Sequence, residues 1–145
     1  MINKLSQEQM QKVLNGEDIL FHYKHECGNH YEEKHWKELS EKEQMLVRKW
    51  VRFMFTYSKR INHNRTSYSL KHDCESDVGF YVHNDSMKKA FLLEGYLAET
   101  GKINWYFNAN GIVSIQKQEK FRNVFKEEIE ELQKEYHEKW GRKED

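Results

Sequence analysis

The sequence predicts an α+β fold: a mainly helical single domain, residues 1–145, with one β-hairpin and a long C-terminal helix. Three observations predict it. Two long segments repeat apolar residues at the helical period, and one Asn-Gly turn lies between two β-prone runs. A chain of 145 residues fits one domain. Because it has no proline and no internal repeat, nothing marks a linker.

The composition predicts an aromatic core and leaves the partner open. Only 37% of the residues are hydrophobic, so eight Phe, eight Tyr and four Trp must supply much of the buried area. Lys plus Arg and Asp plus Glu number 24 each, so the net charge neither favours nor excludes nucleic acid. Cys27 and Cys74 form no C-x-x-C pair, which fits a reducing compartment. With no membrane-length apolar run and no signal-peptide pattern, we expect a cytoplasmic protein without a membrane partner.

The first forty residues predict one short helix and one irregular segment. Ser6 with Gln9 resembles a helix-capping pair, and Gly16 ends the apolar pattern that follows. Residues 18–36 mix aromatic, histidine and charged side chains around the turn-forming pair Gly28-Asn29, so an irregular or hairpin segment is expected.

This segment concentrates metal-ligand residue types within fourteen positions. They are His22, His25, Cys27, His30 and His35. Four such side chains can complete a tetrahedral zinc site, but the spacing matches no standard finger and a second cysteine pair is missing. We therefore expect no metal and no cofactor, with the cluster as loop histidines and zinc as the alternative.

A central helix is predicted from Ser40 to about residue 61. Ser40 with Glu43 forms a capping box, and the apolar stripe that follows covers more than half of the helix circumference. Such a wide stripe predicts neighbours on two sides. Its main members are Leu46, Trp50, Phe53, Met54, Tyr57 and Ile61.

A basic surface is predicted along this helix and just beyond it. Residues 42–71 contain eight Lys or Arg and one acid, a local net charge of +7. We expect it to face phosphate or a partner, with neutral donors at one end; the alternative is a solvated face neutralised by acids from elsewhere in the fold. The predicted residues are Arg48, Lys49, Arg52, Lys59, Arg60, Asn62, His63, Arg65, Ser67 and Lys71.

Residues 62–96 predict two short capped helices. Ser67 is expected to cap a helix that runs through about Glu75, and Gly79 to break the chain before a β-prone run at 80–82. Asn84 or Asp85 is expected to cap the second helix, which Gly95 ends. The pair resembles a helix-turn-helix in outline, but a connection of about eight residues is longer than that motif uses.

The same stretch carries a resemblance. Residues 66–72 read TSYSLKH, residues 81–84 read YVHN, and Lys89-Ala90 and Gly95-Tyr96 follow. This pattern resembles the core of small proteins from bacteriophages and other mobile elements, over about thirty of the 145 residues. That group has no established activity, so the resemblance transfers no catalytic residue. It implies a mobile-element setting, in which small proteins commonly bind host or defence machinery, anti-CRISPR proteins included.

The last third predicts a hairpin and then the long helix. Residues 103–107 and 112–115 are β-prone runs on either side of Asn108–Gly111, whose Asn-Gly suits a hairpin turn. The helix is expected over about 117–140, with an apolar stripe that can also pair two copies in a homodimer. Its back forms an acidic ridge, either a solvated face or a row of carboxylates that imitates phosphates in a basic channel. The ridge residues are Glu127, Glu131, Glu135 and Glu138.

Catalytic signals are weak, so we expect the protein not to be an enzyme. The His-Asn pairs match nuclease motifs only loosely, and neither a Gly-rich phosphate loop nor G-x-S-x-G occurs. The leading hypothesis is an inhibitor that binds a host nucleoprotein complex or effector nuclease, for instance a CRISPR effector. The first alternative is a DNA-binding regulator that contacts nucleic acid directly through its basic helix. A zinc-dependent, nuclease-like enzyme is the less favoured second alternative.

Overall fold

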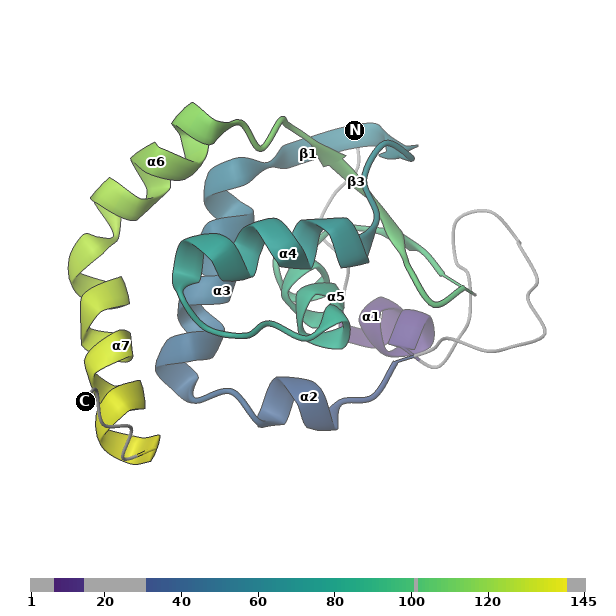
Figure 1. Cartoon of the computed structure of the whole chain (residues 1–145). Helices are drawn as coiled ribbons and strands as arrows, with labels where there is room; N and C mark the ends of the chain where they lie inside the picture. The colour runs from purple at the N-terminus through teal and green to yellow at the C-terminus, as the bar shows by residue number, and fades with distance from the viewer. Residues whose placement is uncertain (1–6, 15–30, 101, 141–145) are drawn as a thin grey trace.

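The computed structural model describes residues 7–14, 31–100 and 102–140, and it confirms the α+β, mainly helical class (Figure 1). A three-stranded antiparallel sheet in the order β1-β3-β2 lies beside the helices. The elements are α1 (Gln7–Leu14), α2 (Lys34–Lys37), α3 (Glu41–Met54), β1 (Thr56–Asn62), α4 (Ser67–Val78), α5 (Asn84–Leu93), β2 (Ala98–Glu99), β3 (Tyr106–Asn110), α6 (Ile115–Val124) and α7 (Lys126–Trp140).

Helix α3 is the central helix, as its wide apolar stripe predicts. The Ser40 and Glu43 capping box is present in both directions. Helix α3 lies between α4 and α5 on one side and α6 and α7 on the other (Figure 1). The core around it is aromatic, with Trp50, Trp105, Phe91 and Phe121 fully buried.

The predicted extension of this helix to residue 61 is wrong. Helix α3 ends at Met54, and Thr56–Asn62 forms strand β1, which pairs with β3 and shifts register between Tyr57 and Asn62. β-branched and aromatic residues such as Thr56 and Tyr57 suit a strand, and the partner strand decides between the two. Lys59 and Arg60 therefore lie on a strand, not on the helix.

The predicted hairpin around Asn-Gly is also wrong. Strand β3 pairs with β1 and β2, residues 112–114 form no strand, and Ser114 caps α6. Gly111 has φ +156°, and a Cβ there would lie 2.4 Å from the carbonyl oxygen of Met54. The glycine is needed because the chain passes close to the end of α3.

Helices α4 and α5 are both present, with different caps. The Thr66 side chain, not Ser67, caps α4 by accepting from the Ser69 amide, and α4 continues to Val78 before Gly79 ends it at φ 88°. His83 caps α5, and residues 80–83 form no strand. Buried Ser67 instead joins α4 to the segment before β3, because its hydroxyl accepts the Trp105 amide at 3.0 Å.

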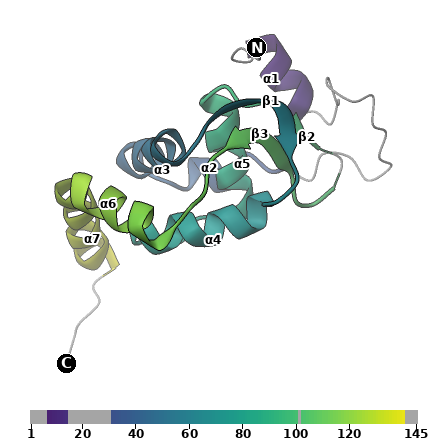
Figure 2. The same ribbon diagram turned by 90° about the horizontal axis from the view of Figure 1, so that it is seen from above.

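The long C-terminal helix is two helices, α6 and α7, that meet at Phe125 (Figure 2). At this residue φ is −107° and ψ is 26°, outside the helical range. The Phe53 ring contacts Phe121 at 5.6 Å and Phe125 at 6.2 Å between centroids. The bend lets both aromatic side chains pack against α3.

The predicted first helix is present as α1 at Gln7–Leu14. The expectations for residues 15–30, including His22, His25, Cys27 and His30, lie outside the described residues. The described helices include none whose length and apolar content would suffice to cross a bilayer.

Candidate functional site

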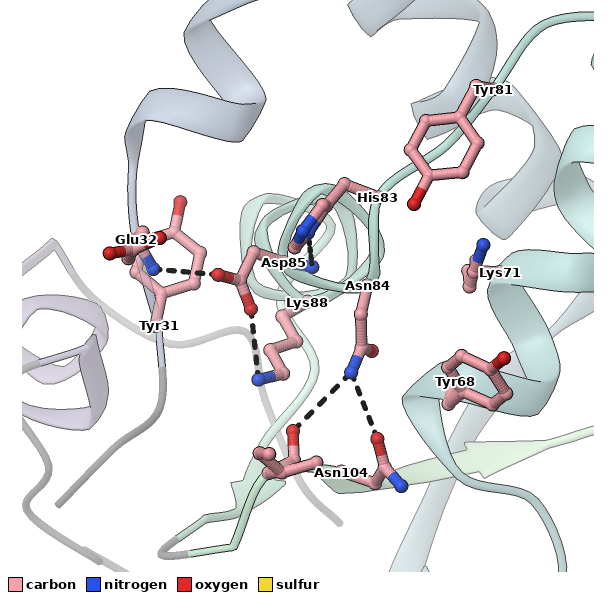
Figure 3. A pocket seen from close by; sticks show the side chains of 11 residues that line it. Tyr31, Glu32, Tyr68, Lys71, Tyr81, His83, Asn84, Asp85, Lys88 and Asn104 are labelled. Carbon is pink, nitrogen blue, oxygen red and sulfur yellow. Dashed lines mark hydrogen bonds and ion pairs between the residues drawn. The ribbon is translucent and has the colours of Figure 1, made fainter. Parts of the chain in front are cut away.

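A cleft of about 720 Å³ opens between the starts of α4 and α5, the segment before α2 and the loop before β3 (Figure 3). This volume lies within the usual range of ligand pockets, about 300–1,000 Å³. Its walls carry three tyrosines, two lysines and several amide, histidine and carboxylate groups. The cleft is therefore polar and aromatic together.

Lys71, a residue of the predicted basic surface, lies in the wall of this cleft. It is only 5% exposed, and its Nζ lies 5.5 Å from the ring centroid of Tyr68 and 4.4 Å from that of Tyr81. Within the described residues, its carboxylate contact is with Glu75 in the next turn, at 3.4 Å. Tyr68 and Tyr81 are 49% and 65% exposed. The cleft thus holds an ammonium group beside two exposed aromatic rings, a favourable cation–π arrangement.

A second lysine forms the floor of the cleft. Lys88 is 1% exposed, with the Asp85 carboxylate 3.0 Å from its Nζ and the Trp105 ring centroid at 4.7 Å. The other Asp85 oxygen accepts the Glu32 amide at 2.8 Å. Burial lowers the pKa of Lys88, and Asp85 opposes that shift. Asp85 therefore connects the Lys88 side chain to the backbone at Glu32.

Asn84 places an unsatisfied acceptor in the cleft. Its Nδ2 donates to the Asn104 side chain at 2.9 Å, and also to the Ile103 carbonyl (Figure 3). Its Oδ1 is buried and accepts no hydrogen bond from the described residues. A buried acceptor without a donor is costly, so a ligand that donates there would be favoured.

His83 separates this cleft from a second pocket of about 320 Å³, which it also lines. Its Nδ1 accepts the Asp85 amide at 3.0 Å, so in the neutral ring the hydrogen is on Nε2. The ring stacks on His35, with centroids 3.4 Å apart and planes 5° from parallel. Burial and the neighbouring His35 lower the pKa of His83, which favours the neutral form.

His35, His83 and Asp85 are the described group whose distances suit a metal, with ligand atoms within 4.8 Å of one another. Their present contacts suit it less. The Nδ1 of His83 and both oxygens of Asp85 already have partners. Lone pairs in two parallel rings do not converge on one ion at about 2.0–2.1 Å. In this arrangement the three residues support the start of α5.

The rest of the predicted basic surface is largely paired with acids. Arg48 and Arg52 bind the buried Glu94 at 2.7 to 2.9 Å. Other pairs join Lys49 to Glu128, His63 to Glu99, and Arg65 to Asp73. The residues are distributed over α3, β1, the turn after β1 and α4.

Four positions of that surface remain. The Asn62 amide donates to the Ala109 carbonyl across the sheet, and Ser67 is buried. Lys59 and Arg60 are exposed on β1 and form no ion pair with any acid in residues 31–100 and 102–140. Both basic side chains of β1 are therefore exposed to solvent.

The four glutamates of the acidic ridge lie on α7 and are exposed. Lys42 of α3 binds Glu131 at 2.7 Å and Glu135 at 3.2 Å. Glu127 and Glu138 make no ion pair within the described parts of the chain. Half of the ridge is thus bound to α3, and the other half faces solvent.

Sequence reasoning found Lys71 but missed most of the cleft. The available signal was the pair of motifs TSYSLKH and YVHN, which contribute Tyr68, Lys71, Tyr81, His83 and Asn84 to its walls. Tyr31 and Lys88 carried no such signal, because each reaches the cleft only through the fold.

No protein family, curated protein or solved structure matches the chain. Function is therefore inferred from the cleft and from the charged surfaces.

Proposed function

We propose that the protein is a non-enzymatic binding protein of a phage or other mobile element. In this proposal the cleft binds a nucleic-acid-handling complex in the host cytoplasm, for instance a CRISPR effector nuclease, and inhibits it. The observation that carries the proposal is the pair of exposed rings, Tyr68 and Tyr81, beside the Lys71 ammonium in a cleft of about 720 Å³. Tyrosines in a concave site are typical of binding hot spots.

The motif residues support the same surface. Tyr68 and Lys71 come from TSYSLKH, and Tyr81 and Asn84 come from YVHN. These positions lie on different elements, yet all four line one cleft. The resemblance to mobile-element proteins is carried by these motifs, so it supports the cleft as the proposed partner-binding surface.

The polar groups of the cleft suit binding better than catalysis. Asp85 is held by the Lys88 ammonium and the Glu32 amide, and the Nδ1 of His83 caps α5. A catalytic base needs a free lone pair within reach of its proton donor. The cleft also contains a cation, two exposed rings and the Asn84 acceptor.

The DNA-binding regulator and the acidic ridge differ in how many of their charged side chains are paired within the fold. A DNA-binding regulator would lack Arg48 and Arg52, which are bound to Glu94. The acidic ridge retains Glu127 and Glu138 as a second contact for the same inhibitory function. The homodimer stays a prediction.

Affinity capture from host cells tests the proposal. We expect the wild-type chain to retain a nucleic-acid-handling complex and to reduce its cleavage activity, and Tyr68→Ala/Tyr81→Ala to lose both. The matched control is Ile115→Ala, which removes an apolar side chain that is 79% exposed and does not line the cleft.

Two charge variants separate the competing surfaces. Loss of the complex by Glu127→Lys/Glu138→Lys alone would assign binding to the acidic ridge instead of the cleft. Salt-sensitive binding of duplex DNA that Lys59→Glu/Arg60→Glu abolishes would favour the regulator. If the wild-type chain captures no such complex and leaves cleavage unchanged, the proposal is wrong.

A further inference from the structure

We propose that the cleft binds one nucleotide unit, with its phosphate on Lys71, its base against the Tyr81 ring and a ligand hydrogen-bond donor on Asn84. The unit can be a free nucleotide or an unpaired nucleotide of a nucleic acid, since both present the same chemistry. This inference rests on the proposed function and names the ligand class of the same cleft.

Lys71 has the positive charge and the hydrogen-bond donors that can bind a phosphate. An ammonium has three donors, and the Glu75 contact is long at 3.4 Å. The same Glu75 oxygen also accepts the Val82 amide at 3.1 Å, so the carboxylate is shared. A phosphate oxygen at normal distance would make a shorter, charge-assisted bond to the ammonium.

The carboxylates that line the cleft do not oppose an anion at that position. Asp85 is bound to Lys88 and to the Glu32 amide. Glu32 lies on the opposite side of the cleft from Lys71 (Figure 3). The carboxylate that lies beside Lys71 is Glu75, and its oxygen also accepts the Val82 amide.

Tyr81 supplies the surface for a base. One face of its ring is directed at the Lys71 ammonium, 4.4 Å from the centroid, and the side chain is 65% exposed. An aromatic base can stack on the exposed ring, because every base has a π-face. Tyr68, 49% exposed, extends the same wall on the other side of Lys71.

Asn84 narrows the ligand class further. Its Nδ2 donates to Asn104 and Ile103, which fixes the orientation of the amide, and its Oδ1 is an acceptor. That buried oxygen has no donor in residues 31–100 and 102–140. A base amino group or a ribose hydroxyl would supply one. A nucleotide combines an anion, an aromatic ring and a hydrogen-bond donor, and it is the ligand class that we propose.

Titration calorimetry of the full chain at low salt tests this with adenosine monophosphate, adenosine, inorganic phosphate, phosphotyrosine and a short single-stranded oligonucleotide. We expect adenosine monophosphate to bind at least about tenfold more tightly than adenosine or phosphate, because each lacks one anchor. Tighter binding of the oligonucleotide would identify nucleic acid as the source, and tighter binding of the monophosphate would identify a free nucleotide.

Variants of exposed Tyr81 test the geometry. Tyr81→Ala should weaken binding of adenosine monophosphate between about fivefold and 150-fold, the range for loss of one stacked base. Tyr81→Phe keeps the ring and should bind nearly as the wild type does, and so should Ile115→Ala. Lys71→Gln should remove the preference for the monophosphate over adenosine.

Four results would overturn the inference: no nucleotide binding at low salt, equal affinity for adenosine and its monophosphate, tighter binding of phosphotyrosine, or an unchanged affinity in Tyr81→Ala. Its failure is distinguishable from failure of the proposed function. A chain that captures the host complex but binds no nucleotide refutes only the inference. A chain that binds nucleotide but captures no complex refutes only the inhibitor function.

Discussion

The solvent-facing side of α3 and the cleft hold basic side chains in opposite ways. On α3, two arginines surround the buried Glu94, and Lys49 binds Glu128. In the cleft, the Lys71 ammonium lies beside two tyrosine rings, and its carboxylate contact is 3.4 Å long. The first group of cations is neutralised within the fold, whereas the second remains able to pair with a ligand.

The difference shows that local charge density in the sequence does not tell which basic side chains pair with acids in the fold. Four of the eight basic residues between residues 42 and 71 lie on α3, yet they join α3 to the end of α5 and to α7. Lys71 is a single cation, but its neighbours are aromatic instead of acidic. The identity of the neighbours decides the role of a basic side chain.

The largest expected effect comes from removing the carboxylate of the α3 network. Glu94→Ala should lower the free energy of unfolding by about 2–3 kcal/mol, because two arginines lose their common partner at a buried position. Denaturant unfolding measures this. Glu127→Ala, an exposed glutamate on α7, is the matched control and should change stability by less than about 0.5 kcal/mol. Equal losses in the two variants would contradict a structural role for the network.

The same network predicts a loss of stability in acid. Burial raises the pKa of Glu94, but hydrogen bonds from Arg52 and Arg48 outweigh it, and the pKa is lowered overall. A lowered pKa in the folded state contributes stability above the ordinary value of about 4.3, and that contribution is lost as the pH falls through the folded pKa. Glu94→Gln should remove this part of the acid dependence.

An intermediate effect is expected at the cleft cation. Lys71→Met keeps the side-chain volume and removes the ammonium, so it should cost about 1 kcal/mol, the scale of its cation–π contacts. Lys59→Met on exposed β1 is the control and should be nearly neutral. A loss as large as that of Glu94→Ala would mean that Lys71 serves mainly the fold, and the contrast with α3 would disappear.

The smallest effect is expected from protonation of His83. Burial and His35 lower its pKa, so the unfolded chain binds the proton more readily. Its stabilisation is present above about pH 6.5 and is lost as the pH falls below that value. The groups around it are Asp85, Lys71 and Lys88, of which only Asp85 opposes the shift.

His83→Asn isolates the contribution of His83 to the pH dependence of stability, because asparagine can still cap α5 without titrating in this range. Unfolding measured between about pH 7.5 and 5.5 should show a shallower decline for the variant than for the wild type. Parallel declines would show that His83 does not supply the pH dependence.

The sequence by itself determined the features that depend on residues within one helical turn. The Ser40 and Glu43 capping box, the stop at Gly79 and the wide apolar face of α3 all formed as predicted. Each is set by contacts three or four residues apart, so the local pattern contains the necessary information. The aromatic core followed from the composition, since few other large side chains could fill it.

Only the tertiary structure decided the strand at Thr56–Asn62, the bend at Phe125, the neutralisation of α3 and the cleft. Strand β1 needs β3, about fifty residues later, and Arg48 meets its carboxylate 46 residues along the chain. The cleft brings Tyr31 and Asn104 together with Lys71 of α4 and Lys88 of α5. Pairings at such separations depend on how the helices pack around α3, and a local period or cap contains no information about them.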